Sequence, residues 1–74
     1  MSNENVLITL KATGKKISDL RGFNIPIILE IIDECEQAGA DQYFIDQLKL
    51  QLQKYQLMVD ELEAKFERLI NRLE

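Results

Sequence analysis

The chain has 74 residues, a formal net charge of -4, one cysteine and no histidine. The core of a chain this short supplies about 3 to 5 kcal/mol, so such domains are usually held by disulfides, a metal or a second subunit. One cysteine closes no intramolecular disulfide and the ligands of a zinc site are missing, so we expect no cofactor and a homo-oligomer. The apolar runs are too short for a signal peptide or a membrane span, which favours a cytoplasmic protein without membrane contact.

Residues 1–24 are expected to form a basic N-terminal arm. The segment NVLITLK alternates apolar side chains in residues of good strand propensity, which predicts a short β-strand at about residues 5–11. The backbone groups of a strand need a partner. Three possibilities stay open: pairing with KKISDL across the turn ATGK, pairing with another subunit, or disorder. Ser18, Gly22 and Asn24 make residues 12–24 loop-like, so we expect a loop there.

A first helix is predicted at about residues 25–38. Pro26 suits the first helical position, where its missing N–H costs nothing, and Ile25 before it is disfavoured in helical geometry. Gly39 supplies the stop. The apolar side chains that recur at helical spacing should pack against the rest of the chain: Ile25, Ile28, Ile32 and Cys35.

A second helix is predicted at about residues 42–74, because Asp41 is a suitable N-cap and neither glycine nor proline follows it. Its length would be roughly 50 Å. Only Gly39 and Ala40 separate it from the first helix, and connections this short join antiparallel neighbours. The fold class is therefore mainly α: an antiparallel helical hairpin, residues 25–74, preceded by a short strand or arm.

The stretch LKLQLQ at residues 48–53 alternates like a strand, but the longer pattern around it is helical. Nine apolar residues are separated alternately by three and four positions, which is an unbroken heptad with Ile45 at position a and Leu48 at d. A strand would mix charged and apolar residues on each face, whereas a helix gathers all nine on one seam. The seam residues are Ile45, Leu48, Leu52, Tyr55, Val59, Leu62, Phe66, Leu69 and Leu73.

Leu50 falls at position f, on the side opposite the seam, together with Tyr43 and Leu57. This second stripe ends where a first helix of about thirteen residues would end, so the two helices of one chain are expected to pack through it. The seam continues further and would face water in a monomer. We therefore expect the seam to form an intersubunit coiled coil or four-helix bundle. A homodimer is favoured over a tetramer, and the orientation of the subunits stays open.

Charge is segregated along the chain. Residues 1–24 carry four basic and two acidic side chains, a balance of +2, whereas residues 25–46 carry six acidic side chains and no basic one. Opposite charges attract within or between subunits, so these two segments are candidates for binding a partner protein. The candidate partner-binding residues are Lys11, Lys15, Lys16, Arg21, Asp33, Glu34 and Glu36.

No set of residues indicates catalysis. There is no histidine to act as a base, Cys35 lies on an apolar helical face where a thiol is inert, and the carboxylates of residues 33–36 lack calcium-loop spacing. TGKKIS lacks the upstream glycine and the hydroxyl residue of a phosphate-binding P-loop. We expect the protein not to be an enzyme.

The order strand, helix, helix resembles that of ribbon-helix-helix DNA-binding dimers, in which paired strands enter the major groove and the lysines of the arm would meet phosphates. The connection at residues 12–24 is longer than that motif needs, and the acidic segment would repel DNA. We therefore expect a protein partner and keep a DNA-binding regulator as the alternative. Size and composition favour a small accessory protein of bacteria or phages: an oligomeric scaffold, adaptor or regulator.

Overall fold

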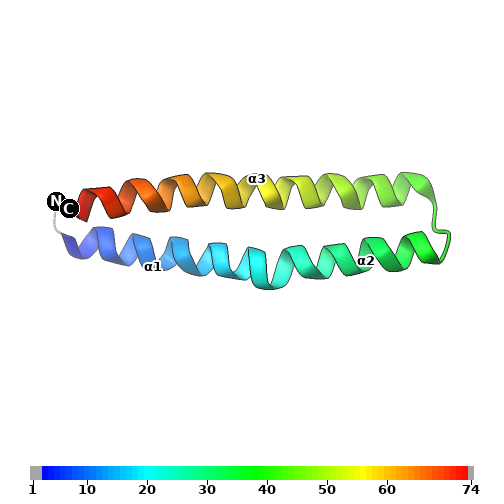
Figure 1. Cartoon of the computed structure of the whole chain (residues 1–74), viewed down its shortest axis with the longest axis horizontal. Coiled ribbons are helices and arrows are strands. Elements are labelled where there is room, and N and C mark those ends of the chain that lie inside the picture. The colour runs from blue at the N-terminus through cyan, green and yellow to red at the C-terminus, as the bar shows by residue number, and fades with distance from the viewer. Residues whose placement is uncertain (1–2, 74) are drawn as a thin grey trace.

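The computed structural model describes residues 3–73 and is a hairpin of two long antiparallel helices (Figure 1). Within these residues every regular element is helical, which confirms the mainly α fold class and the helical hairpin. The Cα atoms span 54 × 15 × 13 Å, so the molecule is a single layer of two helices. In chain order the elements are α1 (Asn3–Asp19), the π-helical turn η1 (Leu20–Asn24), α2 (Ile25–Gln37) and α3 (Gln42–Leu73).

The strand predicted at residues 5–11 is not formed: these residues lie inside α1, and residues 12–24 continue the same helix. A lone strand would leave its N–H and C=O groups without partners, whereas a helix satisfies them internally. The helix also buries Val6 and Leu10 against Leu69 of α3. The segment expected as a basic arm is therefore the first half of one long helix, and we call α1, η1 and α2 together the rod.

η1 joins α1 and α2 into the rod and accommodates one residue more than the heptad spacing allows. The residues that face α3 are spaced by four and three positions from Val6 to Leu20, and by three and four from Ile25 to Cys35. Between Leu20 and Ile25 the spacing is five, one more than a heptad allows. The N–H of Ile25 donates to the carbonyl of Leu20, five residues back, so the wider π turn keeps both segments facing α3.

Pro26 lies at the start of α2, as the sequence predicts, but α2 continues the helix of α1 through η1 and does not follow a loop. A proline within an α-helix lacks the N–H for the bond to residue i-4, and its ring presses on that carbonyl. The π turn widens the backbone immediately upstream, where the ring would otherwise clash. The helix therefore continues past Pro26 without a break.

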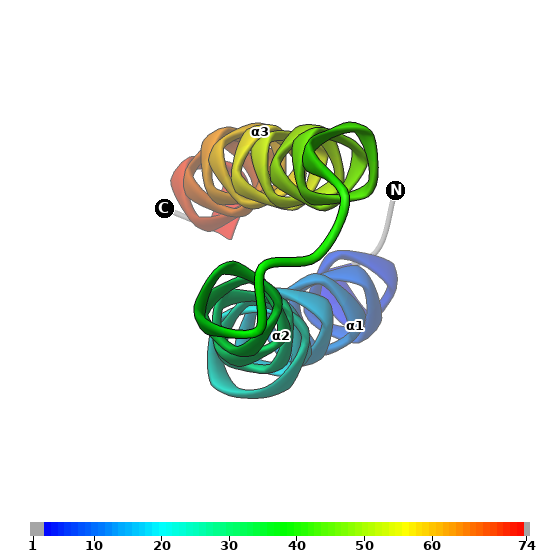
Figure 2. The ribbon, with the colours of Figure 1, turned by 90° about the vertical axis from the view of Figure 1, so that its right-hand side faces the viewer.

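The rod covers the whole seam of α3. All nine seam residues are buried or half-buried within the single chain. At the terminal end Val6, Leu10 and Leu69 form a buried cluster with Phe66 and Leu73 packed against it. Seen along the long axis, the rod and α3 cross (Figure 2), as expected of helices whose seams repeat every 3.5 residues or so. Because the rod includes α1, the reason for assigning the seam to another subunit no longer holds.

The second stripe of α3 does not pack inside the chain. Tyr43, Leu50 and Leu57 have 71%, 49% and 59% of their surface exposed, so their assignment to intrachain packing is wrong. Packing through the seam is favoured because it buries nine apolar side chains along the whole of α3, whereas packing through the stripe would bury three. The residues of α2 assigned with the stripe turn toward the seam instead, and all are buried or half-buried: Ile25, Ile28, Ile32 and Cys35.

The turn between α2 and α3 is a Schellman motif. Gly39 has a φ of 70°, a left-handed conformation that favours glycine. The N–H of Ala40 donates to the carbonyl of Cys35 at 2.9 Å, and the N–H of Gly39 donates to that of Glu36 at 3.2 Å. The carbonyl of Asp41 then accepts the first intrahelical hydrogen bond of α3 at 3.1 Å, as its expected N-cap position requires. This tight reversal fixes which residues of α2 and α3 stand opposite each other.

Candidate interaction surface

The heptad positions define two sides of the interface between the rod and α3. In an antiparallel pair the e positions of both helices border one side and the g positions border the other. On the e side two ion pairs join the helices: Arg21 with Glu63, and Glu36 with Lys49 at 3.5 Å. These side chains are about half exposed, and exposed pairs contribute about 0 to 1 kcal/mol each. They therefore fix the register of the hairpin more than they stabilise it.

The g side near the turn is apolar and only partly covered. Ile31 of α2 and Phe44 and Met58 of α3 occupy g positions, and Ile27 lies beside them at c. Between 36% and 51% of the surface of each of these side chains is exposed. We call these four residues the apolar flank. The hairpin leaves this flank open to a further helix.

Exposed apolar side chains are concentrated near the turn. We define the turn half as residues 22–58 and the terminal half as residues 3–21 and 59–73. Of the large apolar side chains that this part of the chain exposes, nine lie in the turn half and three in the terminal half. Outside the apolar flank, those of the turn half are Phe23, Leu29, Tyr43, Leu50 and Leu57, and those of the terminal half are Leu7, Ile8 and Ile70. Single exposed leucines are ordinary, whereas the four residues of the apolar flank lie together on one side of the hairpin, which makes the flank a candidate interaction surface.

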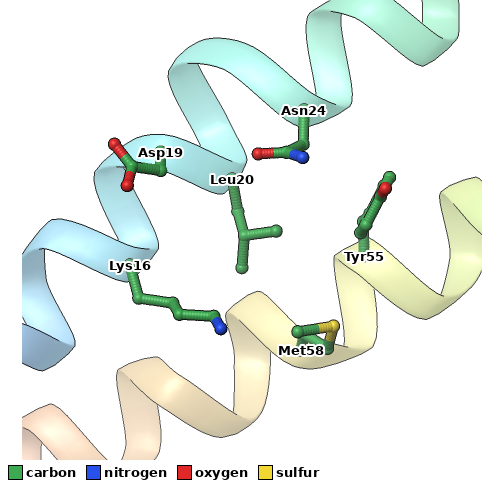
Figure 3. A pocket seen from close by; sticks show the side chains of 6 residues that line it. All are labelled: Lys16, Asp19, Leu20, Asn24, Tyr55 and Met58. Atoms are coloured by element: carbon green, nitrogen blue, oxygen red, sulfur yellow. The ribbon is translucent and has the colours of Figure 1, made fainter.

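The g side of the terminal half is basic and hollowed. Three adjoining hollows of about 300, 310 and 450 Å³ run along it. Figure 3 shows the hollow nearest the π turn, where Lys16 and Leu20 of the rod reach toward Met58 of α3. The basic side chains that line the hollows form what we call the basic groove: Lys16, Lys65, Arg68 and Arg72.

The basic groove has few carboxylates beside it. Asp19 and Glu61 are the acidic residues that line the hollows, and Asp19 is held by Lys15 at 2.9 Å. Within residues 3–73 none of the four basic side chains of the groove forms an ion pair. Leu62 and Leu69 line the hollows beneath them. The groove therefore presents positive charge next to apolar surface, which suits an acidic and partly apolar partner.

The seven residues predicted to bind a partner are all exposed but do not form one site. Lys16 lines the basic groove. Arg21 and Glu36 are engaged in the ion pairs of the e side, and Lys15 is engaged within α1. Asp33 accepts a hydrogen bond from the amide of Gln37 at 2.9 Å. The remaining two residues are Lys11 and Glu34.

Sequence reasoning missed the three residues that complete the basic groove, namely Lys65, Arg68 and Arg72. Their signal was present in the heptad, because Met58, Lys65 and Arg72 recur every seven residues at position g. What the sequence did not show is that Lys16 lies opposite them. That juxtaposition requires residues 12–24 to be helical, since only a continuous rod brings Lys16 alongside α3.

The chemistry of the remaining surface is plain. In the described part of the chain no three His, Cys, Asp or Glu side chains lie close enough together to hold a metal ion. None of the helices there has the length and apolar character needed to cross a membrane. Protein-family models, curated proteins and solved structures give no match to this chain. The apolar flank and the basic groove are therefore the surface features that point to a function.

Proposed function

We propose that the protein is a non-enzymatic helical scaffold or adaptor that works as a homo-oligomer assembled through the apolar flank. The observation that carries this proposal is the apolar flank itself, where both helices of the hairpin expose large apolar side chains on one side. The flank spans both helices of the hairpin, and this is the kind of face that a second hairpin covers in a four-helix bundle. The seam is already covered by the rod, so the interface lies on a different face of α3 from the one the sequence suggested.

The surface area of the molecule supports a second copy as the occupant. The chain exposes 5546 Å², whereas a compact monomer of 8.6 kDa exposes about 4,700 Å². The difference, roughly 800 Å², is about what each partner buries in an interface of standard size. A two-helix layer has this surplus because each helix covers only one face of the other.

The alternative of a DNA-binding regulator loses support from the fold. It required strands at residues 5–11 of two subunits to pair, and these residues are helical. The turn half carries six acidic and two basic side chains, a balance of -4, which opposes the approach of a duplex. We therefore propose association between proteins and not DNA binding.

Light scattering after size exclusion tests this proposal. At low micromolar concentration the wild type should have at least twice the chain mass of 8.6 kDa. Ile31→Lys combined with Phe44→Lys places two charges in the apolar flank and should give a monomer whose helicity, measured by circular dichroism, is unchanged.

Ile8→Lys is the matched control, because Ile8 is an exposed apolar residue of the terminal half. This variant should keep the mass of the wild type. A monomeric wild type, or an unchanged mass of the Ile31→Lys/Phe44→Lys variant, would refute the proposal.

A further inference from the structure

We propose that the basic groove is the docking site for the acidic turn of a second copy, so that the dimer is antiparallel. This inference rests on the proposed self-association and adds its orientation and register. The turn half has a charge balance of -4, and the terminal half, with seven basic and six acidic side chains, has +1. Two parallel hairpins would bring two acidic turns together, whereas antiparallel hairpins place each turn beside the basic groove of the other.

The apolar flank and the basic groove lie on the same side of the hairpin, so one contact engages both. Met58 belongs to the flank and also lines two of the three hollows. Lys16, Lys65 and Ile31 share heptad position g with it. A second hairpin laid along this side would therefore meet apolar surface first and positive charge further along.

Glu34 is the acidic residue of the turn half best placed to reach the groove. It lies three residues after Ile31 and seven after Ile27, which puts it on the same face of α2 as the flank. It is exposed, and within residues 3–73 it forms no ion pair. Glu36, by contrast, is held by Lys49 on the e side.

The register that joins these charges also joins apolar surface. If Glu34 of one copy meets Lys16 of the other, the twofold axis passes midway between these positions, near Ile25 of each copy. Ile27 of one copy then stands at the level of Phe23 of the other. Both of these side chains are exposed in the single hairpin, so the register that pairs the charges also brings two exposed apolar side chains to the same level.

A distance between spin labels tests the orientation. The label is placed at Gln37→Cys in a Cys35→Ala background, since Gln37 is exposed at the end of α2. About twelve residues separate Gln37 from the axis, so the antiparallel dimer should give a label distance of roughly 35 Å. A parallel dimer would bring the labels within about 20 Å, roughly two helix diameters, and that result would overturn the inference.

An exchange of charges tests the contact itself. Lys16→Glu alone and Glu34→Lys alone should each weaken the dimer by roughly three- to tenfold, because each substitution acts twice across the twofold axis. The double variant restores opposite charges and should return the dissociation constant to within about twofold of the wild type. Lys11→Glu, with the same charge change at an exposed b position, should have no effect.

The two proposals fail in different ways. A wild type that stays monomeric at all concentrations defeats the self-association itself. A stable dimer with a short label distance, or with single variants indistinguishable from Lys11→Glu, defeats only the docking of the turn in the groove. A dimer that is weakened by the single substitutions and not restored by the double variant also defeats it.

Discussion

The terminal half and the turn half share one continuous seam, yet their outer surfaces differ. The terminal half exposes three large apolar side chains among the described residues, and the turn half exposes nine. The terminal half is close to neutral, whereas the turn half is acidic. A seam alone is therefore sufficient to form a hairpin, and the residues at positions c, e, f and g decide whether the hairpin is complete without a partner.

Packing at the seam follows the same division. The cluster of mutually packed buried residues found within residues 3–73 lies in the terminal half, around Leu10 and Leu69. There the backbone at Gly14 packs beside Phe66, and a Cβ at this position would make an ordinary van der Waals contact with the ring at 3.4 Å. Among the described residues the terminal half thus has more buried apolar side chains, five against three, and the more polar exterior, and we expect it to be the more autonomous of the two.

Single-residue deletions near the boundary between the halves should have the largest effect. Deleting Gln53 rotates the seam from Tyr55 onward by about 100° relative to the seam before it, so one half loses its contact with the rod. We expect loss of the cooperative thermal transition, followed by circular dichroism.

Deletion of Gly22 combined with Pro26→Ala is the matched comparison. It removes the extra residue of the π turn and makes the spacing from Val6 to Cys35 an unbroken heptad. Because a glycine and a proline are also removed from a helix interior, this variant should melt at or above the wild-type temperature. Equal damage from the two deletions would show that the π turn does not compensate for an extra residue.

Truncation of an apolar side chain to alanine should reduce stability more at a seam residue than at a surface residue. Leu69→Ala removes a buried side chain of the terminal cluster and should lower the free energy of unfolding by about 2 to 4 kcal/mol. Leu50→Ala removes a side chain that is half exposed and should cost about 0.5 kcal/mol or less in the hairpin itself. Urea denaturation at two protein concentrations measures the free energy of unfolding of both variants. A larger loss for Leu50→Ala than for Leu69→Ala would support the intrachain packing of Leu50 that the sequence suggested.

Two glycines of the turn half should respond in opposite directions to alanine. Gly39→Ala places a Cβ at a φ of 70° and should destabilise the hairpin by about 1 kcal/mol. At Gly22 a Cβ meets nothing within 4 Å and the backbone is helical, so Gly22→Ala should stabilise by up to about 1 kcal/mol. The melting temperatures should shift by roughly 4 to 8 °C in opposite directions. Shifts of the same sign would contradict the assigned backbone conformations.

The helical fold of residues 25–73 follows from signals that are local in the sequence. Pro26 and Gly39 sit at special backbone positions, Asp41 starts α3, and the heptad from Ile45 to Leu73 has no fault. Each of these signals acts within one or two turns of a helix. They predict the two helices and their antiparallel arrangement, and they do not require knowledge of the tertiary packing.

The N-terminal helix was missed because local signals there oppose the long-range pattern. Gly22 and Pro26 suggest a loop and a helix start, and NVLITLK has strand propensity. Its seam spacing from Val6 to Leu20 is nevertheless heptad-like, and burial against α3 overrides the propensities. The same error affected the prediction of the candidate site. A short first helix would leave part of the seam uncovered, so the seam was assigned to another subunit. It would also leave Lys16 outside the hairpin, so its position beside Lys65 was not predicted.

The two helix ends at Asn3 and Leu73 lie next to each other, opposite the turn (Figure 1). Tension applied between them would therefore unzip the seam contact by contact, because the force acts on the outermost pair of side chains before any other. The terminal cluster would yield first and the Schellman turn last. A hairpin of this geometry extends at low force and can refold from the turn, so its resistance to pulling is set by one layer of the seam at a time and not by its total stability.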